Sequence, residues 1–394
     1  MKDLAVYIHI PFCVKKCNYC DFLSFPAGEE LWKKYLEKLI KEIIMTASDC
    51  REYIVSSVFL GGGTPSLLDA VCIGDILKAL KDNYKMAGDC EITMEMNPGT
   101  VTPYKLKLYR EYGINRISIG MQSSKDKELK ILGRIHNNEE FLKCYWNVRE
   151  AGFKNVNIDV MSALPAQDYD SYMDTLRQVV SLRPEHISAY SLIIEEGTPF
   201  YDMYGEDSDK NKEVAPLPSE EDERKMYHET KRYLRQMGYE RYEISNYSLI
   251  SKDKDYSCRH NKAYWTGIEY IGFGIGAASM MNHTRWSNIR DIVKYMDILD
   301  KDSGEGFKAL RCDVEELDIH AGMEEFMFLG LRLCKGVSKH KFESLFGQSI
   351  QSVYGNVLDK MLKNKLLEEE GDFIKLTEYG TDISNYVMSE FLFD

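Results

Sequence analysis

The sequence of 394 residues lacks any apolar run approaching the roughly 18–20 residues that a membrane-spanning helix needs. It also lacks an excess of basic residues: 50 lysines and arginines face 63 aspartates and glutamates, which gives a formal net charge of −13. A protein that binds duplex nucleic acid needs a basic face, so this class is disfavoured. The apolar run at residues 4–10 is too short for a signal-peptide core. We expect a cytoplasmic protein of two or three domains.

Cysteine occurs ten times but is not distributed as in a disulfide-rich secreted domain. In a large chain without a secretion signal, clustered cysteines indicate metal or redox chemistry. Three of them form a Cys-x3-Cys-x2-Cys pattern at Cys13, Cys17 and Cys20. The others are isolated, and we expect ordinary buried or surface side chains at these positions. They are Cys50, Cys72, Cys90, Cys144, Cys258, Cys312 and Cys334.

Strand-like and helix-like segments alternate through the first half of the chain. The strand candidates are residues 4–10, 57–60, 91–96, 116–120, 155–161 and 186–193. The helix candidates between them are residues 30–46, 73–81, 103–111, 139–151 and 169–181. This alternation predicts parallel βαβ units. The predicted fold class is therefore α/β, with an incomplete (β/α)6 barrel.

Polar or unusual residues follow the C-terminal end of each predicted strand. They are Cys13, the glycines at 61–63, Glu95 with Asn97, Gln122, Asp159, and Tyr190 with Ser191. Because β/α barrels build their active sites at these strand ends, the pattern predicts one shared site.

The second half of the chain is organised differently. Residues 206–223 hold eight acidic and two basic residues and are expected to form a solvated excursion. A mixed segment follows, with a glycine-rich run at 272–276 that we expect to be a close-packed strand. Helix candidates then precede a short β-like tail at 366–376, and Thr377 starts a final helix. This order predicts a helical, winged-helix-like C-terminal domain. The helix candidates are residues 323–333, 339–346 and 353–363.

We predict domain boundaries that give residues 1–205 as the partial barrel, 206–305 as a segment packing on it, and 306–394 as the C-terminal domain. Residues 310–394 carry 9 basic and 16 acidic side chains, which disfavours a DNA-reading role for the winged-helix-like part.

The cysteine pattern fits an iron–sulfur cluster. Three thiolates on one short loop can hold three irons of a [4Fe–4S] cube and leave the fourth iron open to a small molecule. Lys15 and Lys16 inside the loop favour thiolates. The alternative is a structural zinc ion, which needs a fourth ligand. His9 is the nearest candidate for that ligand.

The cysteine pattern, with Tyr19 before the last cysteine, resembles the radical S-adenosylmethionine (SAM) superfamily. This resemblance implies that SAM chelates the open iron and is cleaved on reduction to methionine and a deoxyadenosyl radical. Further motifs are similar to the coproporphyrinogen oxidase-like (HemN-type) branch. They lie at residues 7–13, 61–65, 95–98, 120–122, 132–136 and 157–159.

The resemblance implies a set of SAM-binding positions. Glycine lets the backbone approach a ligand closely, Glu95 suits ribose hydroxyls or the amino group of SAM, and Arg134 can pair with a carboxylate. The implied SAM-binding residues are Tyr7, Tyr19, Gly62, Gly63, Thr64, Glu95, Gln122, Arg134, Asp159, Ile193 and Ala278.

Two departures separate the chain from the oxidases. Phe22 stands where those enzymes carry a further cysteine, and the first strand starts at residue 4, which leaves no room for their N-terminal extension. The chain therefore resembles the shorter HemW family of haem chaperones. His260, Asn261, Tyr264 and Trp265 match that family's His-Asn-x-x-Tyr-Trp haem motif.

A neutral imidazole is a good ligand for haem iron, and aromatic rings offer flat faces to a porphyrin. His283 and Cys258 lie close to His260 in sequence, so the identity of the iron ligand stays open. A second motif typical of the family, Tyr-Glu-Ile-Ser-Asn, spans residues 242–246.

We expect a haem chaperone that carries a [4Fe–4S] cluster and exchangeable SAM and delivers haem to acceptor proteins, membrane-associated acceptors among them. A cluster-dependent homodimer is a further expectation, nucleic acid is not expected as a partner, and the question of SAM turnover stays open. One alternative is a radical SAM coproporphyrinogen III dehydrogenase. Another is a zinc-structured interaction protein.

Overall fold

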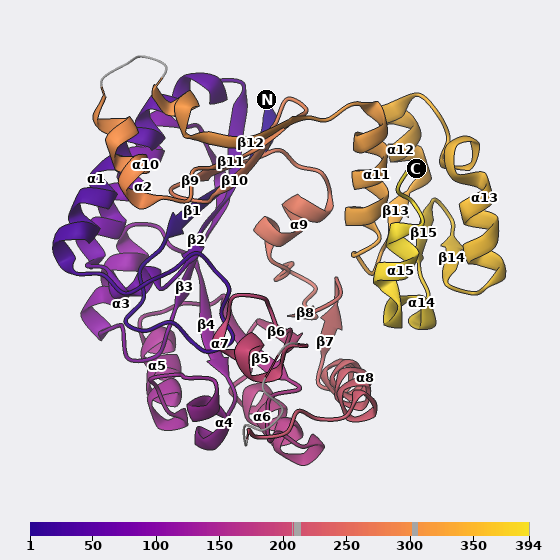
Figure 1. The fold of residues 1–394 in the computed structure, drawn as a ribbon, viewed down its shortest axis with the longest axis horizontal. Coiled ribbons are helices and arrows are strands. Elements are labelled where there is room, and N and C mark those ends of the chain that lie inside the picture. Colours follow the sequence, from indigo (N-terminus) through magenta and orange to yellow (C-terminus); the bar gives the residue numbers. More distant parts are fainter. Residues whose placement is uncertain (207, 209–213, 302–305, 394) are drawn as a thin grey trace.

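The computed structural model describes residues 1–206, 208, 214–301 and 306–393. Figure 1 shows a curved sheet with helices along its outer side, and a separate group of C-terminal helices across from it. Helix α9 lies between these two parts. Among the described residues, no helix has both the length and the apolar character needed to cross a membrane.

Strands β1 to β6 form the centre of the sheet. They lie side by side in the order of the chain, and every neighbouring pair is parallel. Each contains or closely matches a strand predicted from the sequence, so the prediction of an incomplete (β/α)6 barrel is confirmed. The strands are β1 (Lys2–Ile10), β2 (Tyr53–Gly62), β3 (Met86–Met96), β4 (Arg116–Gln122), β5 (Val156–Ser162) and β6 (His186–Ser191).

The helices that return the chain between these strands pack on the outer face of the sheet (Figure 1). Reciprocal capping boxes at Asn137 and Asp168 fix the starts of α5 and α6. The short helix α4 was not predicted from the sequence. The helices are α1 (Glu29–Thr46), α2 (Ala70–Asn83), α3 (Pro103–Glu111), α4 (Asp126–Ile131), α5 (Asn138–Glu150) and α6 (Tyr169–Leu182).

Short strands extend the sheet at both edges. Strand β9 runs parallel to β1, and β10, β11 and β12 follow it in antiparallel order, while β8 and β7 add to β6. Among the described residues, strands β1 to β12 form one sheet. The added strands are β7 (Tyr239–Arg241), β8 (Asn246–Leu249), β9 (Tyr270–Phe273), β10 (Ala278–Met281), β11 (Thr284–Asn288) and β12 (Arg311–Glu316).

We expected the glycine-rich run at 272–276 to be a close-packed strand. Gly272 of this run lies in β9, and a Cβ added to Gly272 would lie only 2.8 Å from the Cβ of Ala277. The acidic segment at 206–223 ends in helix α8, capped by Ser219, with four acidic residues in the first turn, where they complement the helix dipole. Residues 207 and 209–213 of that segment, and 302–305 further on, lie outside the described residues. The domain boundaries proposed from the sequence stay predictions.

The helices of the second half are α7 (Pro199–Tyr204), α8 (Glu220–Gln236), α9 (Arg259–Trp265) and α10 (Ile292–Asp300). Short 3-10 turns are η1 (Ala47–Cys50), η2 (Pro65–Leu67) and η3 (Gly306–Leu310).

The C-terminal part has its own apolar core, which includes Met327, Phe342 and Tyr354. Strand β13 lies between α11 and α12, and β14 and β15 follow α13, so that the three strands form a small antiparallel sheet in the order β13-β15-β14, as in a winged-helix-like domain. Thr377 caps the helix that follows, as predicted. The elements are α11 (Ile319–Gly330), β13 (Val337–Ser338), α12 (Lys339–Phe346), α13 (Ile350–Lys363), β14 (Leu367–Glu370), β15 (Phe373–Leu376), α14 (Glu378–Asp382) and α15 (Ser384–Ser389).

A buried carboxyl joins the first helix to the added strands. Glu42 of α1 accepts hydrogen bonds from the backbone of Gly274 at 2.8 Å, from Asn288 Nδ2 at 2.6 Å and from the Tyr295 hydroxyl at 2.6 Å. Burial raises the pKa of Glu42 to about 7. This one side chain therefore holds α1, β11, α10 and the loop after β9 together.

We predict that Glu42→Ala lowers the free energy of unfolding by about 2–5 kcal/mol, because three buried donors lose their acceptor. Glu37→Ala, on the exposed side of the same helix, is the matched control and should change it by no more than about 0.5 kcal/mol. Urea unfolding followed by circular dichroism measures both. Equal effects of the two substitutions would contradict the role given to Glu42.

Candidate functional site

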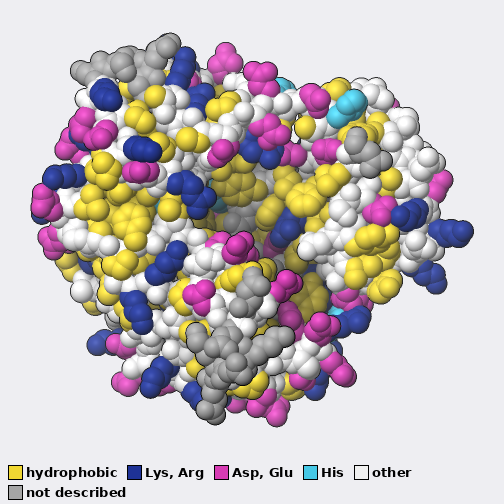
Figure 2. Space-filling view, in the orientation of Figure 1, with side chains coloured by type: hydrophobic (Ala, Val, Ile, Leu, Met, Phe, Trp, Pro, Cys, Tyr) yellow, Lys and Arg dark blue, Asp and Glu magenta, His cyan; other side chains and the backbone are white. Residues whose placement is uncertain are grey.

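Two adjoining cavities lie inside the curved sheet. The smaller has a volume of about 130 Å³ and the larger about 480 Å³. Figure 2 shows the molecule hollowed near its middle, between the sheet and the C-terminal helices. Because the same side chains line both cavities, a ligand in one lies next to a ligand in the other. The shared residues are Phe22, Gly62, Glu95, Ser118 and Asp159.

The three clustered cysteines line the smaller cavity from the loop between β1 and α1. The hydroxyl of Thr64 donates to Cys13 Sγ at 3.5 Å, and Arg134 Nη1 donates to Cys17 Sγ at 3.8 Å. Burial raises the pKa of the Cys20 thiol, and the charge of Lys16 opposes this shift only in part.

The arrangement of the thiols fits a cluster better than a single ion. Within the described residues, no three His, Cys, Asp or Glu side chains are placed to hold one metal ion between them. A tetrahedral zinc site requires such convergence, whereas each thiolate on a [4Fe–4S] cube binds a different iron. Three thiols that line one cavity from a single loop are suited to a cluster. His9, the sequence candidate for a zinc ligand, is instead bonded to Tyr7 and to the carbonyl of Leu23.

The glycine-rich turn after β2 passes very close to the cysteine loop. Gly63 N donates to the carbonyl of Ile10 at 2.7 Å, and Thr64 N donates to that of Phe12 at 2.8 Å. A Cβ on Gly63 would lie 2.6 Å from the Phe12 oxygen, so only glycine fits there. Gly62 has φ +109 and donates to Glu95 Oε2 at 3.1 Å. The turn thus forms one wall of the smaller cavity with exposed backbone.

Arg134 also lines the smaller cavity and is half-buried. Its Nη2 donates to Asn97 Oδ1 at 2.6 Å and to the carbonyl of Gly120 at 2.7 Å, while its Nε has no partner among the described residues. Gln122 lines the same cavity where β4 ends in an irregular register, with a left-handed φ of 69. These groups give the cavity several hydrogen-bond donors.

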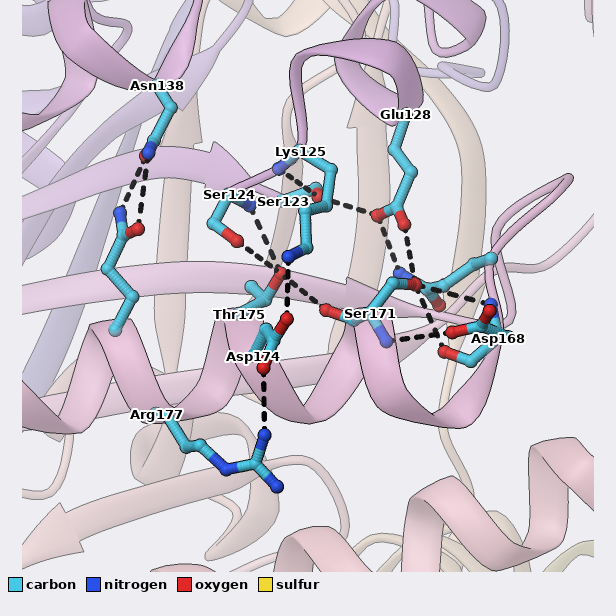
Figure 3. Close-up of polar contacts among 12 residues, drawn as sticks. Ser123, Ser124, Lys125, Glu128, Asn138, Asp168, Ser171, Asp174, Thr175 and Arg177 are labelled. Carbon is cyan, nitrogen blue, oxygen red and sulfur yellow. Dashed lines mark hydrogen bonds and ion pairs between the residues drawn. The ribbon is translucent and has the colours of Figure 1, made fainter.

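The segment that carries Arg134 is anchored by the polar network in Figure 3. The buried carboxylate of Glu128 on α4 accepts from Ser123 Oγ at 2.6 Å, from Ser171 Oγ at 2.8 Å and from Gln167 Nε2 at 3.0 Å. Ser171 belongs to the capping box that begins α6. The network therefore ties the loop after β4, and the helix α4 that precedes Arg134, to the loop after β5.

Two half-buried carboxyls, Glu95 and Asp159, lie where the cavities meet. Burial, with the nearby charge of Asp159, raises the pKa of Glu95 to about 8. Burial also raises the pKa of Asp159, although Asn157 Nδ2 at 2.7 Å and Ser118 Oγ at 3.2 Å donate to it. Glu95 is therefore largely protonated at neutral pH and is ready to ionise beside a cation.

The larger cavity is lined by His260, Asn261 and Tyr264 of α9. His260 is buried and stacks on Phe59 with ring centroids 5.1 Å apart. Its Nδ1 lies 3.3 Å from the Ser57 hydroxyl, and its Nε2 lies 3.1 Å from the Tyr264 hydroxyl. Burial lowers the pKa of His260 to about 3, so the ring is a neutral imidazole at physiological pH.

Trp265, the last residue of the sequence motif, lies elsewhere. Its ring packs under the guanidinium of Arg332, 4.4 Å from the ring centroid, and so faces the C-terminal domain. Residues 260 and 264 share one side of a helix, whereas residue 265 points away from them. Trp265 is not among the residues that line the larger cavity.

The remaining candidate residues from the sequence either line one of the two cavities or lie outside both. Tyr19 lines the smaller cavity and Tyr7 the larger. Ile193 is 67% exposed and Ala278 is exposed on β10, and neither lines the two cavities. His283 is exposed in the turn between β10 and β11, away from the larger cavity, and Cys258 is buried at the start of α9.

Sequence reasoning missed several residues of the larger cavity. Arg116 and Ser118 of β4 line it, as does Phe59 of β2. The signal that could have found them is the period of two along a strand, since Arg116 and Ser118 alternate with buried Ile117 and Ile119.

Comparisons with known proteins agree with this geometry. The model of the radical SAM superfamily matches residues 7–179, and that of the HemN C-terminal domain matches residues 318–383. Among solved structures, the coproporphyrinogen III oxidase HemN of Escherichia coli, a radical SAM enzyme, superposes with a TM-score of 0.83 at 22% identity. It covers 99% of this chain and 90% of that one, which confirms the predicted fold class.

Curated relatives are more similar in sequence. The heme chaperone HemW of Bacillus subtilis is 32% identical over 389 residues, which cover 98% of this chain and 99% of the relative. The heme chaperone HemW of Escherichia coli is 32% identical over 395 residues, which cover 100% and 99%. Since similarity at this level extends over the full length of both chains, the protein belongs to the HemW family of radical SAM proteins.

Proposed function

We propose that this protein is a haem chaperone that binds haem in the larger cavity and passes it to acceptor proteins. One observation carries the proposal: α9 places His260 and Tyr264 in a cavity of about 480 Å³ that adjoins the cysteine-lined one. This volume lies within the ~300–1,000 Å³ of typical cofactor sites. The names of the curated relatives agree with the proposal. A membrane-associated acceptor and a cluster-dependent homodimer stay predictions of the family resemblance.

Membership of the radical SAM superfamily implies an iron–sulfur cluster and SAM. We propose that Cys13, Cys17 and Cys20 hold a [4Fe–4S] cluster. When bound, such a cluster supplies an electron-transfer centre with one iron free to bind SAM. The residues that line the smaller cavity then have separate tasks. The exposed backbone of Gly62 and Gly63 approaches SAM closely, and the guanidinium of Arg134 faces the carboxylate of SAM.

The surroundings of His260 suit the binding of haem iron. The ring is held by Ser57 and Phe59, and it stays neutral because burial lowers its pKa to about 3. The Tyr264 hydroxyl, 3.1 Å from Nε2, must turn aside before that nitrogen can bind iron. In this proposal Tyr264 protects the imidazole when haem is not bound and packs against the porphyrin when it is.

The direct test is a haem titration of the anaerobically reconstituted protein, followed by absorption spectroscopy. We expect a saturable Soret shift near one haem per chain, weakened at least about tenfold in His260→Ala because the iron loses its ligand. His283→Ala, an exposed histidine, is the matched control and should bind as the wild type does. Conversion of coproporphyrinogen III to protoporphyrinogen without saturable haem binding would favour the oxidase alternative instead.

A second prediction concerns the cluster. Cys13→Ser should abolish the [4Fe–4S] absorption and lower iron to background after reconstitution, because a thiolate ligand is lost. Cys312→Ser, on β12 and outside the two cavities, should retain both. Iron analysis and absorption spectra measure the outcome. A normal cluster spectrum in Cys13→Ser would show that the three cysteines are not its ligands.

A third prediction follows from Glu95. SAM brings positive charge beside a carboxyl whose pKa is raised to about 8, so binding favours the ionised form and releases a proton. The affinity for SAM should therefore rise with pH between about 6 and 8 and then level off. The charged or titratable neighbours Asp159, Arg116 and Tyr7 are the same in a Glu95→Gln variant, which should show a smaller slope than the wild type. Anaerobic equilibrium dialysis measures it, and an unchanged slope in Glu95→Gln would refute the assignment.

A further inference from the structure

Arg116 is a buried cation for which the described residues provide no hydrogen-bond partner. It is the first residue of β4, is 2% exposed, and lines the larger cavity. Among the described residues, its guanidinium makes no hydrogen bond or ion pair, and its Nε is sealed from solvent. A guanidinium carries five donors, and buried donors are normally bonded, so a fully enclosed arginine with none engaged needs an explanation.

The acidic groups nearest to Arg116 are engaged elsewhere. Asp159 accepts from Asn157 and Ser118, and Glu91 Oε1 accepts from the backbone of Arg259 at 2.9 Å. Burial opposes the charge of Arg116, but the surrounding polar groups, Glu91 and Asp159 among them, keep its pKa raised. The side chain therefore remains a cation whose hydrogen-bond donors are free.

Arg116 lines the larger cavity and not the smaller one. Arg116 does not line the smaller cavity, where Arg134 is the guanidinium. It lies close enough to His260 that its charge lowers the pKa of that imidazole further, after burial. A ligand that fills this cavity and reaches His260 therefore also meets Arg116.

We propose that Arg116 binds a carboxylate of the ligand that occupies the larger cavity, and that this carboxylate is a porphyrin propionate when the ligand is haem. The inference rests on the proposed function for the identity of the ligand. Arginine is suited to this task, because its planar fork pairs with a carboxylate through two parallel hydrogen bonds. Arg116 would then select porphyrins that carry free carboxylates and fix the orientation of the ring at His260.

The test compares haem with haem dimethyl ester, whose propionates are neutral, in titrations of the reconstituted protein. The wild type should bind haem about tenfold or more tightly than the ester, since a hydrogen bond to a charged group is lost. Arg116→Gln should lose this preference by weakening haem binding while leaving the ester unchanged. Arg177→Gln, an exposed arginine on α6, removes the same charge and should keep the preference.

Arg116→Lys is a second test variant, to be used if Arg116→Gln does not fold. It keeps the charge but loses the fork, so it should bind haem severalfold more weakly than the wild type and the ester equally well. Equal affinity of the wild type for haem and its ester would overturn the inference without any variant, as would an undiminished preference in Arg116→Gln. Weakened SAM binding with an intact haem preference would also overturn it. If the wild type bound neither porphyrin, the proposed function itself would fail.

Discussion

The parallel strands present polar side chains to the inside of the curved sheet and apolar ones to the helices, and the whole proposed site depends on this alternation. On β4, Ile117 and Ile119 pack into the core, while Arg116 and Ser118 line the larger cavity. A strand fixes this arrangement, because successive side chains point to opposite faces. A sheet with an apolar interior would fill itself with side chains. The polar interior instead leaves room for ligands.

Much of the fold could be predicted, because β1 to β6 and their helices follow from local patterns. The edge strands β7, β8, β10, β11 and β12 were not predicted, because each is only three to six residues long. The pairing of β9 with β1 was not predicted either, because the two strands are far apart in the chain. The cysteine loop and the glycine turn were predictable as motifs. The role of Arg116 was not predictable, because its lack of a hydrogen-bond partner becomes visible only when Glu91 and Asp159 are found bonded to other groups.

Helix α9 links the larger cavity to the C-terminal domain. Its His260 and Tyr264 face the cavity, whereas Trp265 packs against Arg332. Just after the helix, the carbonyl of Thr266 accepts a hydrogen bond from Lys341 of α12 at 2.9 Å. A displacement of Tyr264 by haem would therefore act on the same short helix that holds the C-terminal domain.

We propose two iron centres in adjoining cavities, one at the cysteine loop and one at α9. The most direct measurement is a crystal structure of the protein loaded with cluster, SAM and haem, with the iron atoms located by anomalous scattering. We expect one set of iron peaks beside Cys13, Cys17 and Cys20, and a separate iron beside His260 inside the sheet. An iron from haem on the outer surface, or on the C-terminal domain, would contradict it.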